Sequence, residues 1–224
     1  MAWSQGQDNH SFLPGGLMTL REPEIRPDSE RNVGEQTEAV FRNYMYQSYE
    51  NDLNREDAQD IPVVNELLHL SDPPSPEADI GRQLARFGDS INAKYADVFD
   101  SMISNLNLDS DNSENAYEDF AQIARRVLTT KINWGTILIL LNFGYRIALT
   151  VLRSKTSQFL SFLARIVSYI CRFIISERIA KWIADHGGWR AALSYIPLMS
   201  SKPFWLVTAL QAAAVIGIIF SHRL

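Results

Sequence analysis

Residues 133–152 read NWGTILILLNFGYRIALTVL. Most of this stretch is apolar on nearly every face, and a helix of that kind must be covered by other helices or by lipid. Its apolar part gives about 24 Å of helix, less than a hydrocarbon core of about 30 Å, and Asn142 and Arg146 interrupt it. We therefore predict a buried central helix rather than a membrane span, with Asn133 as its N-cap. Gly144, in mid-helix, indicates a neighbour packed close to the backbone.

The composition favours one folded domain with tails. The chain has 224 residues, of which 46% are hydrophobic, so it can bury one sizeable core. Its single cysteine, Cys171, excludes a disulfide within the chain and fits a reducing compartment. We expect Cys171 to be a small buried residue on an apolar helix rather than a redox group.

Charge is distributed unevenly along the chain. Residues 1–130 hold 24 acidic and 10 basic residues, a balance of −14, whereas residues 131–224 hold 2 and 11, a balance of +9. The basic, apolar part is the kind of sequence that meets anionic lipid or an acidic partner. Its basic residues alternate with long aliphatic runs instead of forming a polar basic face, which argues against nucleic acid as a partner.

The carboxy-terminal residues 204–220, FWLVTALQAAAVIGIIF, contain no charge. They give about 25 Å of helix, which suits a thin membrane. We therefore predict a carboxy-terminal membrane anchor; a terminal core helix is the alternative. Because such an anchor emerges last from the ribosome, the rest of the chain is expected to fold and remain in the cytosol. The anchor residues are Phe204, Trp205, Leu210, Ile216 and Phe220.

The expected domain organisation has three parts. Residues 1–32 mix Gly, Pro, Ser and acidic residues without periodicity and are predicted to be disordered. Residues 33–196 form a helical domain that contains an acidic, proline-containing linker, 52–76. Residues 203–221 form the anchor.

Hydrophobic periodicity predicts helices on both sides of the central one. Ser75-Pro76 opens a helix whose apolar residues recur three and four apart, with Gly81 and Gly88 weakening it by about 1 kcal/mol each relative to Ala. This helix could leave its site at low cost, or it could be an ordinary core helix with awkward glycines. An apolar face continues over residues 98–106, and further helices are predicted over residues 34–51, 114–130, 159–174, 179–183 and 189–195. The expected fold is all-α, with seven or eight helices around the central one.

Motifs of the common enzyme classes are missing from the sequence. It contains no phosphate-binding loop, no Gly-x-Gly-x-x-Gly, no His-Glu-x-x-His and no cysteine pair, and its four histidines are scattered. We therefore predict that the protein is not an enzyme and has no catalytic residues, cofactor or metal.

Three segments resemble the homology motifs of the Bcl-2 family of apoptosis regulators. Residues 80–92, IGRQLARFGDSIN, resemble the third motif, 133–135 with 142–148 the first, and 179–193, IAKWIADHGGWRAAL, the second. Their order and spacing also match, over about residues 33–221. Within the family, residues 36–44 and 114–120 and the terminal anchor are most similar to its pore-forming effector members.

The resemblance implies a Bcl-2-like bundle and a pro-apoptotic effector at the mitochondrial outer membrane, with the endoplasmic reticulum as a second location. In such effectors, an activator's third-motif helix docks in a groove, and the bundle opens. The released third motif then docks in another copy's groove, and the oligomers release cytochrome c. Implied partners are third-motif helices of pro-apoptotic activators, pro-survival family members, further copies of the chain and outer-membrane lipid.

The resemblance also implies the residues of each site. The third motif contributes Ile80, Leu84, Phe87, Gly88, Asp89 and Ile91; the groove contributes Met102, Leu106, Ile123, Val127, Asn133, Trp134, Gly135 and Thr136; and the second motif contributes Trp182, Gly187, Gly188 and Trp189. Gly88 is expected to let a partner surface approach closely.

Thr136 departs from the family pattern Asn-Trp-Gly-Arg, in which the arginine pairs with the motif's aspartate. A threonine offers a neutral hydrogen bond of about 1 kcal/mol instead of a charge-assisted one of roughly 1.5–3 kcal/mol. We therefore expect Asp89 to be held weakly, or to pair with Lys131.

Two other functions are compatible with the same motifs. A pro-survival member would use the same fold and groove to sequester pro-apoptotic helices without opening. A membrane tether without apoptotic function would neither bind helices nor permeabilise membranes.

Overall fold

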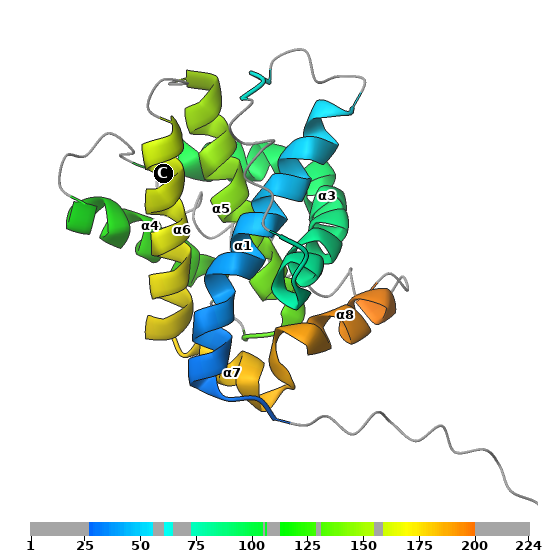
Figure 1. Ribbon diagram of the computed structural model, residues 1–224. Helices are drawn as coiled ribbons and strands as arrows, with labels where there is room; N and C mark the ends of the chain where they lie inside the picture. The colour runs from blue at the N-terminus through cyan, green and yellow to red at the C-terminus, as the bar shows by residue number, and fades with distance from the viewer. Residues whose placement is uncertain are drawn as a thin grey trace, which may run out of the picture.

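Helix α5 (Trp134–Ser154) lies at the centre of the computed structural model, where it passes behind α1 (Glu30–Leu53) and lies beside α6 (Phe159–Ser176) in the view of Figure 1. The structure describes residues 27–55, 61–64, 73–104, 106, 113–128, 131–154 and 159–199. The other helices are α3 (Pro76–Ile103), α4 (Ser113–Val127), α7 (Ile179–Asp185) and α8 (Gly188–Met199). Regular structure in these ranges is helical throughout, which confirms the predicted all-α bundle.

Burial settles the role of α5. By length and composition both α5 and α6 could cross a membrane, but 89% of the most apolar window of α5 is buried inside the bundle. A β-carbon placed on Gly144 would lie 2.7 Å from the ring of Phe41 and 3.0 Å from Ile170. Because α1 and α6 pack this close to the α5 backbone, the predicted core helix and its close neighbour are both confirmed.

Helix α1 begins earlier than the sequence pattern indicates. Ser29 is its N-cap, and the Ser29 hydroxyl accepts a hydrogen bond of 3.1 Å from the Asn32 amide. The amide of Asp28 donates to the carbonyl of Ala184, 2.9 Å away, and thereby ties the start of α1 to α7. The helix therefore starts at Glu30 rather than near residue 34, and the end of the segment predicted to be disordered is folded.

Helix α3 contains the third motif and lies beside α1 along much of its length (Figure 1). The predicted start is confirmed: the Ser75 hydroxyl accepts a hydrogen bond of 3.1 Å from the Ala78 amide, and Pro76 occupies the first turn. The helix continues to Ile103 with one kink at Tyr95, where φ is −123° and ψ is 15°.

Part of the linker 52–76 packs on α1. The Tyr49 hydroxyl donates to the carbonyl of Pro62 at 2.7 Å and accepts from the amide of Val64 at 2.9 Å. Residues 61–64 of this linker are not helical, and 65–70 lie outside the described residues. The predicted anchor, 203–221, also lies outside them.

Candidate helix-binding site

The apolar stripe of the third motif faces the core. Ile80, Leu84 and Ile91 are 5%, 3% and 1% exposed, and Phe87 is partly buried against the same core. Burying a side chain of this size stabilises a fold by about 1.5–3 kcal/mol. The face that the motif would present to a groove is therefore covered in this state.

The two glycines of the third motif let α3 approach α1. A β-carbon on Gly81 would lie 2.4 Å from the carbonyl oxygen of Val40, and one on Gly88 would lie 2.1 Å from the hydroxyl of Tyr44. These separations are too short for any side chain without a shift of the surrounding atoms. In this state, the close approach predicted at Gly88 is to α1 of the same molecule.

Asp89 of the third motif is bonded to the end of α1. Its carboxylate accepts a hydrogen bond of 2.7 Å from the side-chain amide of Asn51. Burial, and the nearby Asp52, raise the pKa of Asp89, while the bond from Asn51 and the charge of Arg55 oppose that rise. The partner of Asp89 is therefore Asn51, and the expected pairing with Lys131 or Thr136 is wrong for this state.

The hydroxyl and the backbone amide of Thr136 both have hydrogen-bond partners at the start of α5. Its hydroxyl accepts a hydrogen bond of 3.0 Å from the Asn133 amide, and the Asn133 side chain accepts one of 3.0 Å from the Thr136 amide. This reciprocal pair has the geometry of a capping box, in which two backbone amides at a helix start are satisfied together. The N-cap predicted at Asn133 is confirmed, and the hydroxyl of Thr136 also donates to nearby backbone carbonyls.

The remaining groove residues lie on α3, just beyond its end, and on α4. Met102 lies near the end of α3, Leu106 beyond that end, and Ile123 on α4, and each is partly buried against the core. Leu106 also lines a small cavity with Phe120 and Tyr169. Val127, at the end of α4, is partly exposed. The predicted groove residues thus lie on α3, just beyond its end, on α4 and at the start of α5.

The second motif covers the end of the bundle at which α1 begins. Gly187 and Gly188 have φ angles of 93° and 72°, which non-glycine residues rarely adopt, and a β-carbon on Gly188 would lie 2.5 Å from the carboxylate of Asp28. Trp189 is 1% exposed, and its indole donates to Thr37 on α1 at 3.2 Å.

An aromatic cluster joins the first and second motifs. The ring of Trp134 lies 5.3 Å from that of Trp182 and 6.4 Å from that of Tyr195, centroid to centroid. This cluster holds α7 and α8 against the start of α5, at the end where the predicted groove residues 133–136 lie.

A buried polar contact near the third motif was not predicted. Asp52, 5% exposed, accepts a hydrogen bond of 2.6 Å from the hydroxyl of Tyr145 on α5. Burial, and the charge of Asp52, raise the pKa of Tyr145 well above its usual value. In the sequence, the only sign of this contact was that Asp52 falls on the apolar face of α1, and that position does not identify Tyr145 as its partner. Asn51 and Asp52 therefore tie the end of α1 to α3 and α5 respectively.

Comparison with known proteins agrees with this arrangement. Residues 84–189 match the family model described as apoptosis regulator proteins, Bcl-2 family. The chain is 37% identical over 174 residues to the human Bcl-2 homologous antagonist/killer, or Bak, covering 77% of this chain and 79% of that protein. The chain belongs to the Bcl-2 family. It is an apoptosis regulator of that family, and the resemblance seen in its three motifs is confirmed.

Other members of the Bcl-2 family share less sequence with it. The mouse apoptosis regulator BAX is 26% identical over 152 residues, covering 66% of this chain and 71% of that protein. The crystal structure of Trichoplax adhaerens trBcl-2L2 bound to trBak BH3 superimposes with a TM-score of 0.53 at 19% identity, covering 71% of this chain and 99% of that one. This structural likeness shows a common Bcl-2 fold.

Proposed function

We propose that this chain is a pro-apoptotic effector of the Bak type. In the closed molecule, its third-motif face is buried, as described above. A partner helix in its groove triggers opening, the third motif is released, and it docks in the groove of another copy. The resulting homo-oligomers permeabilise the mitochondrial outer membrane and release cytochrome c. Residues 203–221 anchor the protein there, and the domain of residues 33–196 faces the cytosol.

The observation that carries this proposal is the burial of the third-motif stripe. Uncovering Ile80, Leu84 and Ile91 costs about 5–9 kcal/mol in total, so the helix stays in place until another apolar groove can accept it. A groove on a second copy would restore the same kind of burial, so the opened form gains by pairing. Activation by a partner helix followed by self-assembly fits this balance.

Partner helices are the expected ligands of the groove. The Trichoplax relative binds a Bak BH3 helix, and its fold is shared by this chain. By analogy, this chain would bind third-motif helices of activators and would itself be sequestered by pro-survival members. Its similarity to Bak favours the effector over the pro-survival alternative.

A leakage assay tests the effector function. The full chain is inserted into dye-loaded liposomes with an anionic, outer-membrane-like composition and exposed to a BH3 peptide from a pro-apoptotic activator. We expect dye release and crosslinkable dimers. Met102→Glu, which places a charge at a partly buried groove position, should abolish both, whereas Met102→Leu should retain them.

The other functions predict different results. If this chain releases no dye and also inhibits dye release by a second, known effector, the pro-survival role would be established. Absence of leakage, of peptide binding and of inhibition would leave only the membrane tether.

A further inference from the structure

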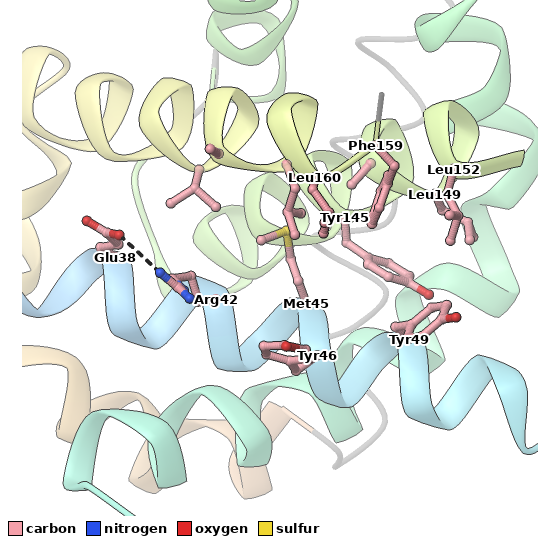
Figure 2. A pocket seen from close by; sticks show the side chains of 14 residues that line it. Glu38, Arg42, Met45, Tyr46, Tyr49, Tyr145, Leu149, Leu152, Phe159 and Leu160 are labelled. Carbon is pink, nitrogen blue, oxygen red and sulfur yellow. Dashed lines mark ion pairs between the residues drawn. The ribbon is translucent and has the colours of Figure 1, made fainter. Parts of the chain in front are cut away.

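A cavity of about 290 Å³ lies between α1, α5 and α6, outside the third-motif and groove residues described above (Figure 2). Its walls include Met45 and Tyr49 of α1, Tyr145 and Leu149 of α5, and Leu163 and Ala164 of α6. Three helices therefore contribute to one cavity, and the proposed self-assembly uses none of these side chains.

The walls present carbon rather than polar atoms to the cavity. The hydroxyl of Tyr145 is bonded to Asp52 at 2.6 Å, and that of Tyr49 to the backbone of Pro62 and Val64. Because these hydroxyls already have partners, the tyrosines contribute their rings. The interior suits an aliphatic chain.

A cation lies at one end of the cavity. Figure 2 shows Arg42 and Glu38 at one end, with Tyr49 and Tyr145 toward the other. The Arg42 guanidinium is 3.6 Å from the Glu38 carboxylate, and the two side chains are 36% and 61% exposed. An exposed ion pair of this length is weak, so Arg42 can exchange Glu38 for another carboxylate at little cost.

We infer that this cavity binds a single-chain fatty acid of about ten carbons, with the chain between the three helices and the carboxylate on Arg42. The size follows from volume. An engineered apolar cavity of about 150 Å³ holds one benzene, so about twice that volume holds about twelve non-hydrogen atoms, the number in decanoate. Glu38 turns into solvent when the carboxylate binds.

Binding should stabilise the closed bundle. The cavity exists only while α1, α5 and α6 are together, and a ligand that binds only one state raises the population of that state. This consequence rests on the proposed effector function. Decanoate would then delay peptide-triggered leakage from liposomes that contain the protein.

Photocrosslinking tests the site directly. The full-length protein in phosphatidylcholine liposomes is irradiated with a decanoic acid analogue that carries a diazirine near its methyl end. Adducts on the protein are then mapped by mass spectrometry. We expect adducts on the cavity walls, at Met45, Leu149 or Leu163. Excess decanoate should compete for them, and decanol, which lacks the carboxylate, should compete at least fivefold less well.

Matched variants distinguish binding of the fatty acid in the cavity from its partition into the membrane. Ala164→Leu, at an exposed position on the cavity wall, narrows the cavity and should reduce the wall adducts at least tenfold, whereas Gln122→Leu places the same side chain at an exposed position of α4 and should change nothing. Arg42→Gln alters a partly exposed side chain and should weaken competition by decanoate about fivefold, the effect of one weak ion pair.

Three outcomes would overturn the inference: adducts confined to residues 203–221, equal adducts in Ala164→Leu and the unmodified chain, or equal competition by decanol and decanoate. Failure of the cavity is distinguishable from failure of the proposed function. A chain that leaks dye on triggering but gives no wall adduct refutes only the cavity. Wall adducts in a chain that never leaks refute only the effector function.

Discussion

Gly81→Ala should loosen the contact between α1 and α3 and make the closed bundle easier to open. A β-carbon at residue 81 would lie 2.4 Å from the Val40 carbonyl oxygen and 2.9 Å from the Tyr44 amide nitrogen. Both atoms belong to the backbone of α1, so no side-chain rotation relieves the contact. The two helices must move apart until the shorter distance reaches ordinary van der Waals contact, at 3.4 Å or more.

Two opposing effects set the change in stability that Gly81→Ala causes. Alanine is a better helix former than glycine by about 1 kcal/mol, which favours the variant. Overpacking a tight interface costs about 1–3 kcal/mol, and the backbone contact places this site in the upper part of that range. We expect a net loss of about 1–2 kcal/mol, so the melting temperature should fall by about 2–8 °C for a domain of this size.

Gly34→Ala is the matched control. Gly34 also lies in a helix interior, but its β-carbon would meet only the Ile175 side chain, at 3.7 Å. The same chemical change there should gain about 1 kcal/mol from helix propensity alone and raise the melting temperature by about 2–4 °C. The two variants should therefore shift stability in opposite directions.

Far-UV circular dichroism of the full chain on small vesicles measures both melting temperatures. A second measurement is the fraction of open molecules at a limiting concentration of activator peptide, detected by protease sensitivity of α1. A loss of 1–2 kcal/mol should raise the ratio of open to closed molecules about 5–30-fold in Gly81→Ala. If Gly81→Ala were as stable as Gly34→Ala, the reasoning on close helix contact would be refuted.

Three further predictions concern titration, thiol reactivity and capping. Because burial raises the pKa of Asp89, its protonated form favours the closed bundle: that contribution is full below an unfolded pKa of about 3.9 and is lost as pH rises through the closed-state pKa. Asp89→Asn should therefore be more stable than the unmodified chain at pH 7, by a margin that shrinks on acidification; a margin independent of pH would contradict this. Burial raises the pKa of the Cys171 thiol to about 12, so iodoacetamide should alkylate it slowly in the closed protein and at least tenfold faster after triggering, and equal rates would argue against opening around α6. Thr136→Arg removes the hydroxyl that caps the Asn133 amide and should lower stability by about 0.5–1 kcal/mol, while a charge-assisted bond strengthens binding of BH3 peptides that carry the aspartate. Calorimetric titration with such a peptide and with its Asp→Ala form checks this, and an unchanged dissociation constant for the first would refute it.

Much of the fold followed from sequence pattern. The apolar run after Asn133 could only be a covered helix, and its polar interruptions at Asn142 and Arg146 favoured a protein environment over lipid, as α5 shows. Ser75-Pro76 and Asn133 were recognisable as helix starts because capping is local chemistry within one turn. The start of α1 was misplaced because Ser29 and Asp28 precede any apolar periodicity, and their contacts are with α1 itself and with α7.

The sequence by itself determined where most of the helices lie, which face of each is apolar, and which family the chain resembles. Only the tertiary structure decided which surface covers each face. Gly88 predicted a close approach to a partner surface, but in this structure the surface that approaches Gly88, and Gly81 as well, is α1 of the same molecule. The sequence predicted that Asp89 is held weakly or pairs with Lys131. In the folded chain its carboxylate accepts a hydrogen bond from Asn51 instead. The physical reason is that periodicity records burial along one helix, whereas partners 38 or more residues away depend on how helices cross and pack.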